Sequence, residues 1–264
     1  MVFDIVLFAM YKTLLKEDLE KILGLPNGYC VDGVLSCGHY DVEKQIVRLE
    51  KSLNDAKISY QIDRQIGYLQ NIFEVRIGDR IYWFTVVYGG VTLSEYLHFA
   101  CVFGSKKNIH IGSCGGLYPK INSVDFLIPT WSYGNESSTR FYDREDTDNI
   151  HYPNKELSSR IKSKLDSEKV WEGPVMTCEA MLAETKEDVE KWSKEGYFGV
   201  EMETSTVFAV SNHFNVPSAS LVYVTDNLIK GQVVGDKSHT QQKEFRHQKA
   251  QKMFDVAVEV LLEK

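Results

Sequence analysis

The sequence predicts a single-domain α/β protein in which a central mixed, largely parallel sheet lies between two layers of helices. Three observations lead to this three-layer fold class. Apolar segments of strand length alternate with segments of helical periodicity along most of the chain. The 264 residues are 43% hydrophobic and 25% charged, which is enough apolar material for a full core. No Pro-, Gly- or Ser-rich run and no internal repeat divides the chain.

We therefore expect residues 1–264 to form one domain, with residues 1–30 as an N-terminal extension packed on it. In the first half, Gly24 stops a helix, Gly38 follows a strand and Gly78-Asp79 favours a hairpin turn. The spacing of apolar residues sets the type of each element. In chain order we expect a helix over 14–23, strands over 31–37, 72–78 and 80–87, a helix over 93–103, and strands over 108–112 and 125–129.

The second half alternates helices and strands more regularly. Residues 132–153 are polar and aromatic, and we expect a long surface loop there. The elements that follow are a helix over 155–166, a strand over 170–177, helices over 184–195 and 203–214, a strand over 218–225 and a helix over 238–262. Ligands of α/β folds gather at the carboxyl ends of strands, so these ends are where we look for a site.

Composition and charge exclude several classes of protein. The net charge is −7 without a basic stripe, so nucleic-acid binding is not predicted. The apolar start, Met1 to Met10, carries Asp4, is too short to cross a bilayer and lacks a basic leader region, so neither a membrane association nor a signal peptide is predicted. An odd number of cysteines without a Cys-x-x-Cys pair indicates a reduced, cytoplasmic protein. They are Cys30, Cys37, Cys101, Cys114 and Cys178.

One candidate motif is Ile111-Gly112-Ser113-Cys114-Gly115-Gly116, which follows a predicted strand. Glycine lets backbone amides approach a ligand closely, so successive N–H groups can hold an anion, and the Ser113 hydroxyl could help. No Gly-Lys-Ser/Thr follows, so this is not a Walker loop. The alternative is an ordinary strand-to-loop turn.

A second motif, Gly38-His39-Tyr40-Asp41-Val42-Glu43, follows the first core strand. Tyr40, Asp41 and Glu43 could reach a ligand at that strand end. The alternative is the solvated start of a helix. The seven histidines of the chain show no metal-ligand spacing, so no metal is expected.

Carboxylates surround the apolar segment between residues 199 and 227. Glu201-Met202-Glu203 places two acids two residues apart, so one can face a ligand while the other is structural. A carboxylate suits the vicinal hydroxyls of a sugar, and Met202 could pack against the sugar. Asp226 ends a buried strand, where burial disfavours the charged form and favours proton donation. The alternatives are helix-dipole acids and an Asx turn.

Taken together, four segments resemble the nucleoside phosphorylase family, which holds hexameric purine nucleoside phosphorylases, uridine phosphorylases and methylthioadenosine/S-adenosylhomocysteine nucleosidases. They are Gly112–Gly116, Gly199–Glu203, Val224–Asn227 and the amphipathic C-terminal helix with Arg246. Their order and spacing match that family from about residue 31 to the C-terminus. The resemblance implies a nucleoside phosphorylase-like fold and cleavage of an N-glycosidic bond.

The resemblance also implies roles for single residues. Asp226 corresponds to the acid that protonates the purine N7, and Arg246 to the arginine that helps this transfer. Glu203 corresponds to the residue that binds the ribose 2′- and 3′-hydroxyls. Around these, the implied ribose-binding residues are Met202 and Glu201, and the implied base-binding residues are Met181, which replaces the usual aromatic side chain, Thr225 and Asn227.

The phosphate site departs from the pattern of the family. Gly38 and Ser113 match phosphate-contacting positions, but Val42 and His110 stand where two arginines are usual. A third arginine, donated across a subunit interface, corresponds to Arg64. The nucleosidase branch lacks these arginines and activates water with a glutamate at the place of Glu43. A neutral histidine is a poor substitute for a bidentate arginine at a phosphate site.

The sequence thus predicts phosphorolysis of a purine nucleoside to free base and ribose 1-phosphate, with inorganic phosphate as co-substrate and no cofactor. Two alternatives stay open, a hydrolytic nucleosidase and a non-catalytic nucleoside-binding module. The resemblance further implies a homo-oligomer, either a dimer or a hexamer built as a trimer of dimers.

Overall fold

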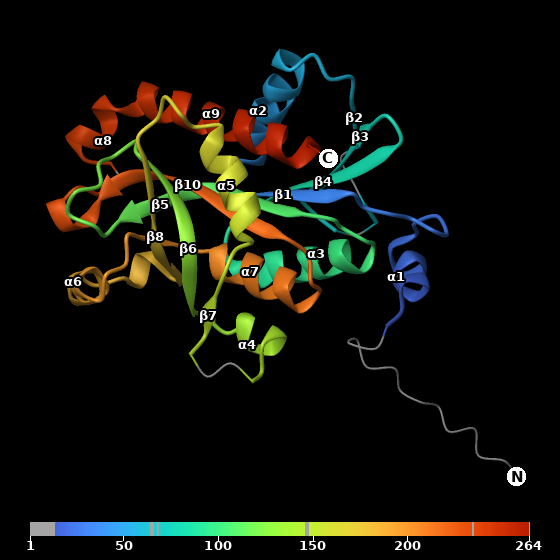
Figure 1. Cartoon of the computed structure of the whole chain (residues 1–264), viewed down its shortest axis with the longest axis horizontal. Coiled ribbons are helices and arrows are strands. Elements are labelled where there is room, and N and C mark those ends of the chain that lie inside the picture. Colours follow the sequence, from blue (N-terminus) through green and yellow to red (C-terminus); the bar gives the residue numbers. More distant parts are fainter. Residues whose placement is uncertain (1–13, 64–65, 68, 146–147, 234, 264) are drawn as a thin grey trace, which may run out of the picture.

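A mixed sheet of ten strands runs through the computed structural model, which describes residues 14–63, 66–67, 69–145, 148–233 and 235–263 (Figure 1). The strands are β1 (Gly33–Gly38), β2 (Gln61–Asp63), β3 (Ile72–Ile77), β4 (Arg80–Val87), β5 (Asn108–Gly116), β6 (Phe126–Asn135), β7 (Ile150–His151), β8 (Val170–Cys178), β9 (Gly199–Glu201) and β10 (Ser218–Asn227).

Helices lie on both faces of this sheet. They are α1 (Lys16–Leu23), α2 (Val42–Asp55), α3 (Gly90–Val102), α4 (Thr139–Tyr142), α5 (Lys155–Ser163), α6 (Lys186–Lys194), α7 (Thr204–His213), α8 (Lys237–Gln241) and α9 (Lys243–Leu262), with short 3₁₀ turns η2 (Met181–Ala183) and η3 (Leu228–Lys230). Helices α2, α5 and α9 cover one face, and α3 and α7 cover the other (Figure 1). None of the helices in the described ranges has both the length and the apolar character needed to cross a membrane.

Part of the sheet closes on itself. Strand β5 pairs with β1, β9 and β10, β10 pairs with β6, β6 with β8 and β8 with β9, so five strands form a ring. Strands β1, β4, β3 and β2 extend from this ring as an open sheet. The predicted α/β class with a mixed sheet is confirmed, but the sheet is not largely parallel. Among the described strands five pairings are parallel and five antiparallel.

The two sides of β1 face two separate cores. Leu35 packs under α2 and α9 with Phe84 and Phe254, whereas Val34 packs under α3 and α7 with Trp83. Successive side chains of a strand point to opposite faces, so a strand buried on both sides needs an unbroken apolar run. That requirement explains the sequence Gly-Val-Leu-Ser-Cys of β1.

The N-terminal segment is described from residue 14 onward. Leu19 and Leu23 of α1 pack into the core beside Trp83, and the Tyr29 hydroxyl accepts a hydrogen bond of 2.8 Å from Trp83 Nε1. Tyr29 also donates to the buried carboxylate of Glu74. These contacts attach residues 14–30 to the sheet, and the extension over 1–30 otherwise stays a prediction.

Several elements differ from the sequence prediction. The surface loop expected over 132–153 is wrong in part, because β6 continues to Asn135 and pairs with β7, and Ser132, Thr139 and His151 are buried. Helix α2 was not predicted, although Ile46, Leu49 and Leu53 form its buried face. Unpredicted elements also include β2, α4, β7 and β9, and the last helix divides into α8 and α9. Very short elements carry too few residues to show a period.

A close approach of α3 and α7 depends on Gly90. A β-carbon at this position would overlap with Oγ1 of Thr206 on α7 and lie 3.2 Å from Oε1 of Glu179. We expect Gly90→Ala to lower the free energy of unfolding by about 1–3 kcal/mol, because a packed interface must shift to admit the methyl group. Urea unfolding followed by circular dichroism measures the change.

The matched control is Val91→Ala, which removes side-chain atoms from the next residue of the helix. Val91 is 55% exposed, so its replacement should change the free energy of unfolding by less than about 0.5 kcal/mol. Equal stability of Gly90→Ala and the wild-type protein would contradict the packing role of Gly90.

Candidate active site

The side chains that could bind a ligand or take part in catalysis gather where β1, β5, β9 and β10 end. Strand β5 runs parallel to β1 and β10, with Cys37 and Leu221 both in register with Ile111. The carboxyl ends of these three strands therefore meet, which is the usual ligand position in α/β folds. Gly38 lies at the end of β1, and the Glu-Met-Glu segment leads from β9 into α7.

Glu203 is held at the centre of this group. It is 4% exposed, and its Oε1 accepts a hydrogen bond of 2.6 Å from the Gly89 backbone N–H. Its Oε2 packs against Gly38 so closely that a β-carbon there would lie 2.5 Å away. Gly38 must therefore be glycine for Glu203 to adopt this position, and the structure brings these two predicted site residues together.

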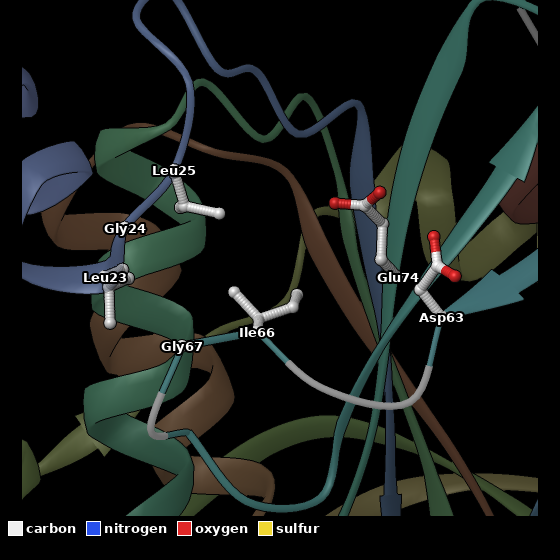
Figure 2. Close-up of a pocket in the computed structure, with 7 residues that line it drawn as sticks. All are labelled: Leu23, Gly24, Leu25, Asp63, Ile66, Gly67 and Glu74. Atoms are coloured by element: carbon white, nitrogen blue, oxygen red, sulfur yellow. The ribbon is translucent and has the colours of Figure 1, made fainter.

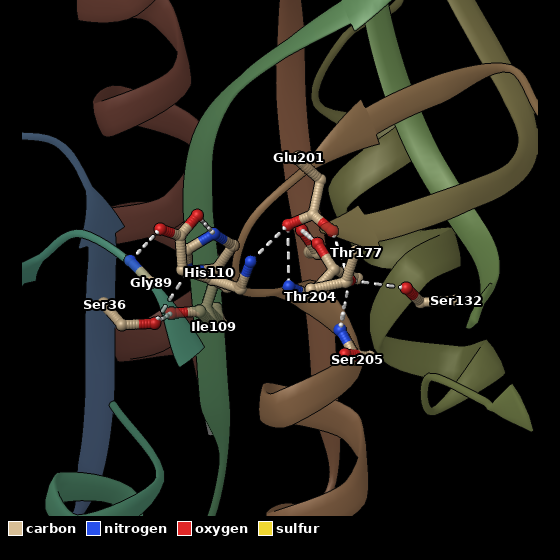
Figure 3. Close-up of polar contacts among 11 residues, drawn as sticks. Ser36, Gly89, Ile109, His110, Ser132, Thr177, Glu201, Thr204 and Ser205 are labelled. Carbon is tan, nitrogen blue, oxygen red and sulfur yellow. Dashed lines mark hydrogen bonds and ion pairs between the residues drawn. The ribbon is translucent and has the colours of Figure 1, made fainter. Parts of the chain in front are cut away.

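Glu201 has a structural role at the start of α7. Its carboxylate accepts hydrogen bonds from the Thr177 hydroxyl and from the backbone N–H groups of Glu203 and Thr204, at 2.9 and 2.6 Å respectively (Figure 3). These contacts satisfy N–H groups at the start of α7, and the negative charge complements the helix dipole. The predicted contact of Glu201 with ribose is therefore corrected, because both its oxygens are used inside the fold.

The two carboxylates influence each other. Burial raises the pKa of both, and the charge of Glu201 raises the pKa of Glu203 further. The hydrogen bond from Gly89 acts in the opposite direction and favours the ionised form of Glu203. A ligand that brings more hydroxyl donors would have the same effect, so Glu203 has the properties of a receptor for hydroxyl groups.

His110 lies beside this acid but cannot act as a phosphate-binding cation. It is fully buried, its Nδ1 lies 3.0 Å from Oγ of Ser36, and its Nε2 lies 3.8 Å from Oε2 of Glu203 (Figure 3). Burial lowers the pKa of His110 to about 3, so the ring is neutral near pH 7. The phosphate contact predicted for His110 is therefore corrected to a neutral contact next to Glu203.

Asp226 lies at the end of β10, where the strand is irregular. Val224 pairs with Cys114 and Asp226 pairs with Gly115, so Thr225 between them is the extra residue of a β-bulge. A bulge changes the direction in which the following side chain points. Asp226 is buried, and the Thr225 hydroxyl donates a hydrogen bond to its carboxylate. The predicted acid and one predicted base-binding residue are therefore in contact.

Asn227, the next residue, has a structural role. Its side-chain amide donates to the carbonyl groups of Tyr118 and Ile121 at 3.0 and 2.9 Å, and its side-chain oxygen accepts from the N–H of Lys230. The residue thereby ties η3 to the loop after β5. This corrects the prediction that Asn227 binds the base, because both amide hydrogens are used within the protein.

Tyr88 and Glu184, which the sequence did not single out, lie close to predicted site residues. Tyr88 stacks on Tyr40 with ring centroids 3.8 Å apart, and its hydroxyl donates to Sδ of Met181 at 3.5 Å. Met181 is 43% exposed and so is available to a ligand. Burial and the charge of Asp226 raise the pKa of Glu184 to about 7. Tyr88 and Gly89 follow β4, so the strand-end rule could have identified them.

The other predicted residues are more scattered. Glu43 is exposed on the first turn of α2, whereas Ser113 and Met202 are half-buried. The half-buried Arg246 lies on α9, and its charge reaches Tyr223 of β10. Arg64 lies outside the described residues. The structure thus unites Gly38, Glu203 and His110 in direct contact and leaves Glu43 at the surface.

His110, Glu201 and Glu203 have possible metal-ligand atoms within 4.8 Å of one another. Glu201 already accepts hydrogen bonds at both of its oxygens, so we keep the prediction of a metal-free site.

A cavity of about 410 Å³ lies between α1 and β3 and is lined by Leu23, Gly24, Leu25, Asp63, Ile66, Gly67 and Glu74 (Figure 2). None of these seven residues belongs to the candidate site.

Residues 64–262 match the model of the phosphorylase superfamily. The chain therefore belongs to the phosphorylase superfamily. Residues before 64, including β1 and α2, lie outside that match.

Curated relatives and solved structures agree with this family. A DeoD-type purine nucleoside phosphorylase from Clostridium beijerinckii is 27% identical over 50% of this chain and 56% of the relative. A guanosine phosphorylase from Halorubrum lacusprofundi is 24% identical over 51% of this chain and 56% of its own length. The chain thus spans little more than half the length of these relatives. A uridine phosphorylase structure from Vibrio fischeri superposes with a TM-score of 0.75 at 16% identity, covering 92% and 96% of the two chains.

The buried neutral His110 should make stability depend on pH. The folded protein keeps the ring neutral, whereas the unfolded chain binds a proton below about pH 6.5, so acid favours the unfolded state. From about pH 7 to about pH 5 this effect should cost the wild-type protein about 2 kcal/mol. We expect His110→Gln to lose that much less stability over the same interval.

Denaturant unfolding of both proteins at the two pH values measures this difference. The raised pKa values of Glu201 and Glu203 act in the opposite direction, because protonation of these acids stabilises the folded protein as pH falls. They are present in both proteins and largely cancel in the comparison. Identical pH dependence of the two proteins would exclude a neutral buried His110.

Proposed function

We propose that this protein cleaves the N-glycosidic bond of a purine nucleoside by phosphorolysis and releases free base and ribose 1-phosphate. The observation that carries the proposal is the position of Glu203 just after β9 and of Asp226 on β10, two strands that both pair with the end of β5, so that one acid can bind ribose and the other can face the base. Family membership and the names of the purine- and guanosine-cleaving relatives support it.

The proposed mechanism begins with the sugar. Glu203 accepts hydrogen bonds from the 2′- and 3′-hydroxyls, and Met202 packs against the ring. These contacts fix the anomeric carbon in front of the nucleophile, which removes much of the entropic cost of the reaction. The Gly89 N–H holds Glu203 in place before the substrate arrives.

The base leaves with a developing negative charge that the protein must neutralise. Asp226 donates a proton to the purine N7, with Arg246 assisting from α9. Thr225 orients the Asp226 carboxyl through its hydroxyl. Met181 and Tyr88 lie at the opening and provide a surface against which a flat base can pack.

Hydrolysis is the second candidate, because Val42 and the neutral His110 remove two positive charges from the usual phosphate site. Water would then attack the same carbon and give free ribose. Glu43 is the residue predicted to activate that water, although it is exposed on the first turn of α2. A non-catalytic nucleoside-binding module would not need Asp226 as an acid.

Product analysis separates these functions. We expect base release from inosine, adenosine or guanosine only when phosphate is present, with ribose 1-phosphate formed in equal amount. Chromatography of each reaction with and without phosphate measures both products, and uridine and methylthioadenosine serve as competing substrate classes. Equal release in phosphate-free buffer would exclude phosphorolysis, and no release with any nucleoside would leave a binding module.

Asp226→Asn should lower kcat by roughly 10²- to 10⁴-fold, which is the usual effect of losing a general acid. The matched control is Asp166→Asn, the same change at an exposed position after α5, which should leave kcat unchanged. Glu43→Gln should retain activity in a phosphorylase and lose it in a nucleosidase. Full activity of Asp226→Asn would rule out Asp226 as the acid.

A further inference from the structure

Arg48 is a buried cation whose side chain contacts Gln45 and His247. It lies on the sheet-facing side of α2, is 6% exposed, and donates from Nη1 to Oε1 of Gln45 at 3.0 Å. Its Nη2 lies 3.3 Å from Nδ1 of His247 on α9. No carboxylate in the described ranges forms an ion pair with Arg48. Burying a charge without a partner is costly, because lost hydration is not offset by an opposite charge.

Two donor groups of this cluster have no acceptor. They are Nε of Arg48 and Nε2 of Gln45, both buried and both without a hydrogen-bond partner among the described residues. Buried donors of this kind are rare, because the hydrogen bonds they lose to water are normally replaced within the protein. A ligand with negative charge and several acceptor atoms would satisfy both groups, and a tetrahedral oxyanion has these properties.

The cluster adjoins the candidate active site. Sγ of Cys37 lies 3.9 Å from Oε1 of Gln45, and the next residue of β1 is Gly38, which packs against Glu203. On β10, the charge of Arg48 opposes the burial-induced rise in the pKa of Tyr223, which is the register partner of Ser113. Arg48 is therefore near the end of β1, which carries Gly38, and near the residue of β10 that pairs with Ser113.

Charges of both signs act in the region of Arg48. Arg48 and Lys44 both help to lower the pKa of His39, and Arg246 acts with Arg48 on Tyr223. Asp41 is the carboxylate whose charge acts on Arg48, and it is already engaged as the N-cap of α2 through the Lys44 N–H at 3.1 Å. Two further cations thus act on the same neighbouring groups as Arg48, whereas the Asp41 carboxylate is used to cap the helix.

We propose that Arg48 is the phosphate-binding cation of this protein and reaches the anion from α2, in place of the arginines that are absent at Val42 and His110. This inference rests on the proposed phosphorolysis. The Gln45 amide and the Ser113 hydroxyl contribute further donors to the anion. Phosphate held there lies on the sugar side of the site, where its oxygen can attack the anomeric carbon as the bond to the base breaks.

Binding is tested first without any reaction. We expect inorganic phosphate at millimolar concentration to raise the Tm of the wild-type protein above its value in chloride of equal ionic strength. Arg48→Gln should abolish this shift. Lys51→Gln should retain the Tm shift, because this substitution removes the same charge from an exposed position on the same helix. An Arg48→Gln protein that responds to phosphate like the wild type would overturn the proposal, as would a wild-type protein that does not distinguish phosphate from chloride.

Kinetics provides the second test. In phosphorolysis, Arg48→Gln should raise KM for phosphate roughly 10- to 100-fold, as expected for the loss of a charge-assisted hydrogen bond, and change KM for the nucleoside much less. If Arg48→Gln does not fold, Arg48→Lys keeps the charge but loses the planar fork and should still raise KM for phosphate. Unchanged KM for phosphate in a folded Arg48 variant would refute the role of Arg48.

The two proposals can fail separately. Phosphate-dependent base release that is insensitive to Arg48→Gln leaves the proposed function intact and removes the inference. A phosphate-specific Tm shift that Arg48→Gln abolishes, without base release from any nucleoside, retains the anion site and removes phosphorolysis.

Discussion

The burial of two acids within three residues is the constraint on which the site depends. Glu201 and Glu203 are both nearly inaccessible to water, and their charges repel each other. The fold satisfies Glu201 completely with the Thr177 hydroxyl and the first N–H groups of α7. Glu203 is held by backbone hydrogen bonds from Gly89 and Met202, without a side-chain hydroxyl donor such as Thr177 among the described residues. The difference in hydrogen bonding makes one acid structural and the other available to a ligand.

The closed part of the sheet places the partners of Glu203 within reach. Because β5 pairs with β1, β9 and β10 at once, the strand ends that carry Gly38, the Glu-Met-Glu segment and Asp226 are grouped around the end of β5. Small residues allow these strand ends to pack closely together. A side chain at Gly38 would collide with Glu203, and one at Gly116 would approach Val224 and the backbone of Asp226. The same packing buries His110 so fully that it stays neutral.

In the proposed site, positive charge comes from a later turn of α2. The resemblance to the family implies arginines at the positions of Val42 and His110, and neither residue carries charge at neutral pH. Arg48 lies further along α2, where it contacts Gln45 of the same helix and His247 of α9. If Arg48 binds the anion as proposed, the residue that supplies the charge has moved to another part of the same helix.

The sequence by itself determined the alternation of helices and strands, the strand ends and the identities of Glu203, Asp226, Gly38 and Ser113 as candidates. These features follow from local periodicity and from short motifs, which a single chain segment contains. Only the tertiary structure decided that Glu201 caps α7, that Asn227 anchors a loop, that His110 is neutral and that Arg48 is buried between α2 and α9. Each of these depends on burial and on partners far away in the chain, such as Thr177 for Glu201 and His247 for Arg48. Propensity and spacing contain no information about such distant contacts.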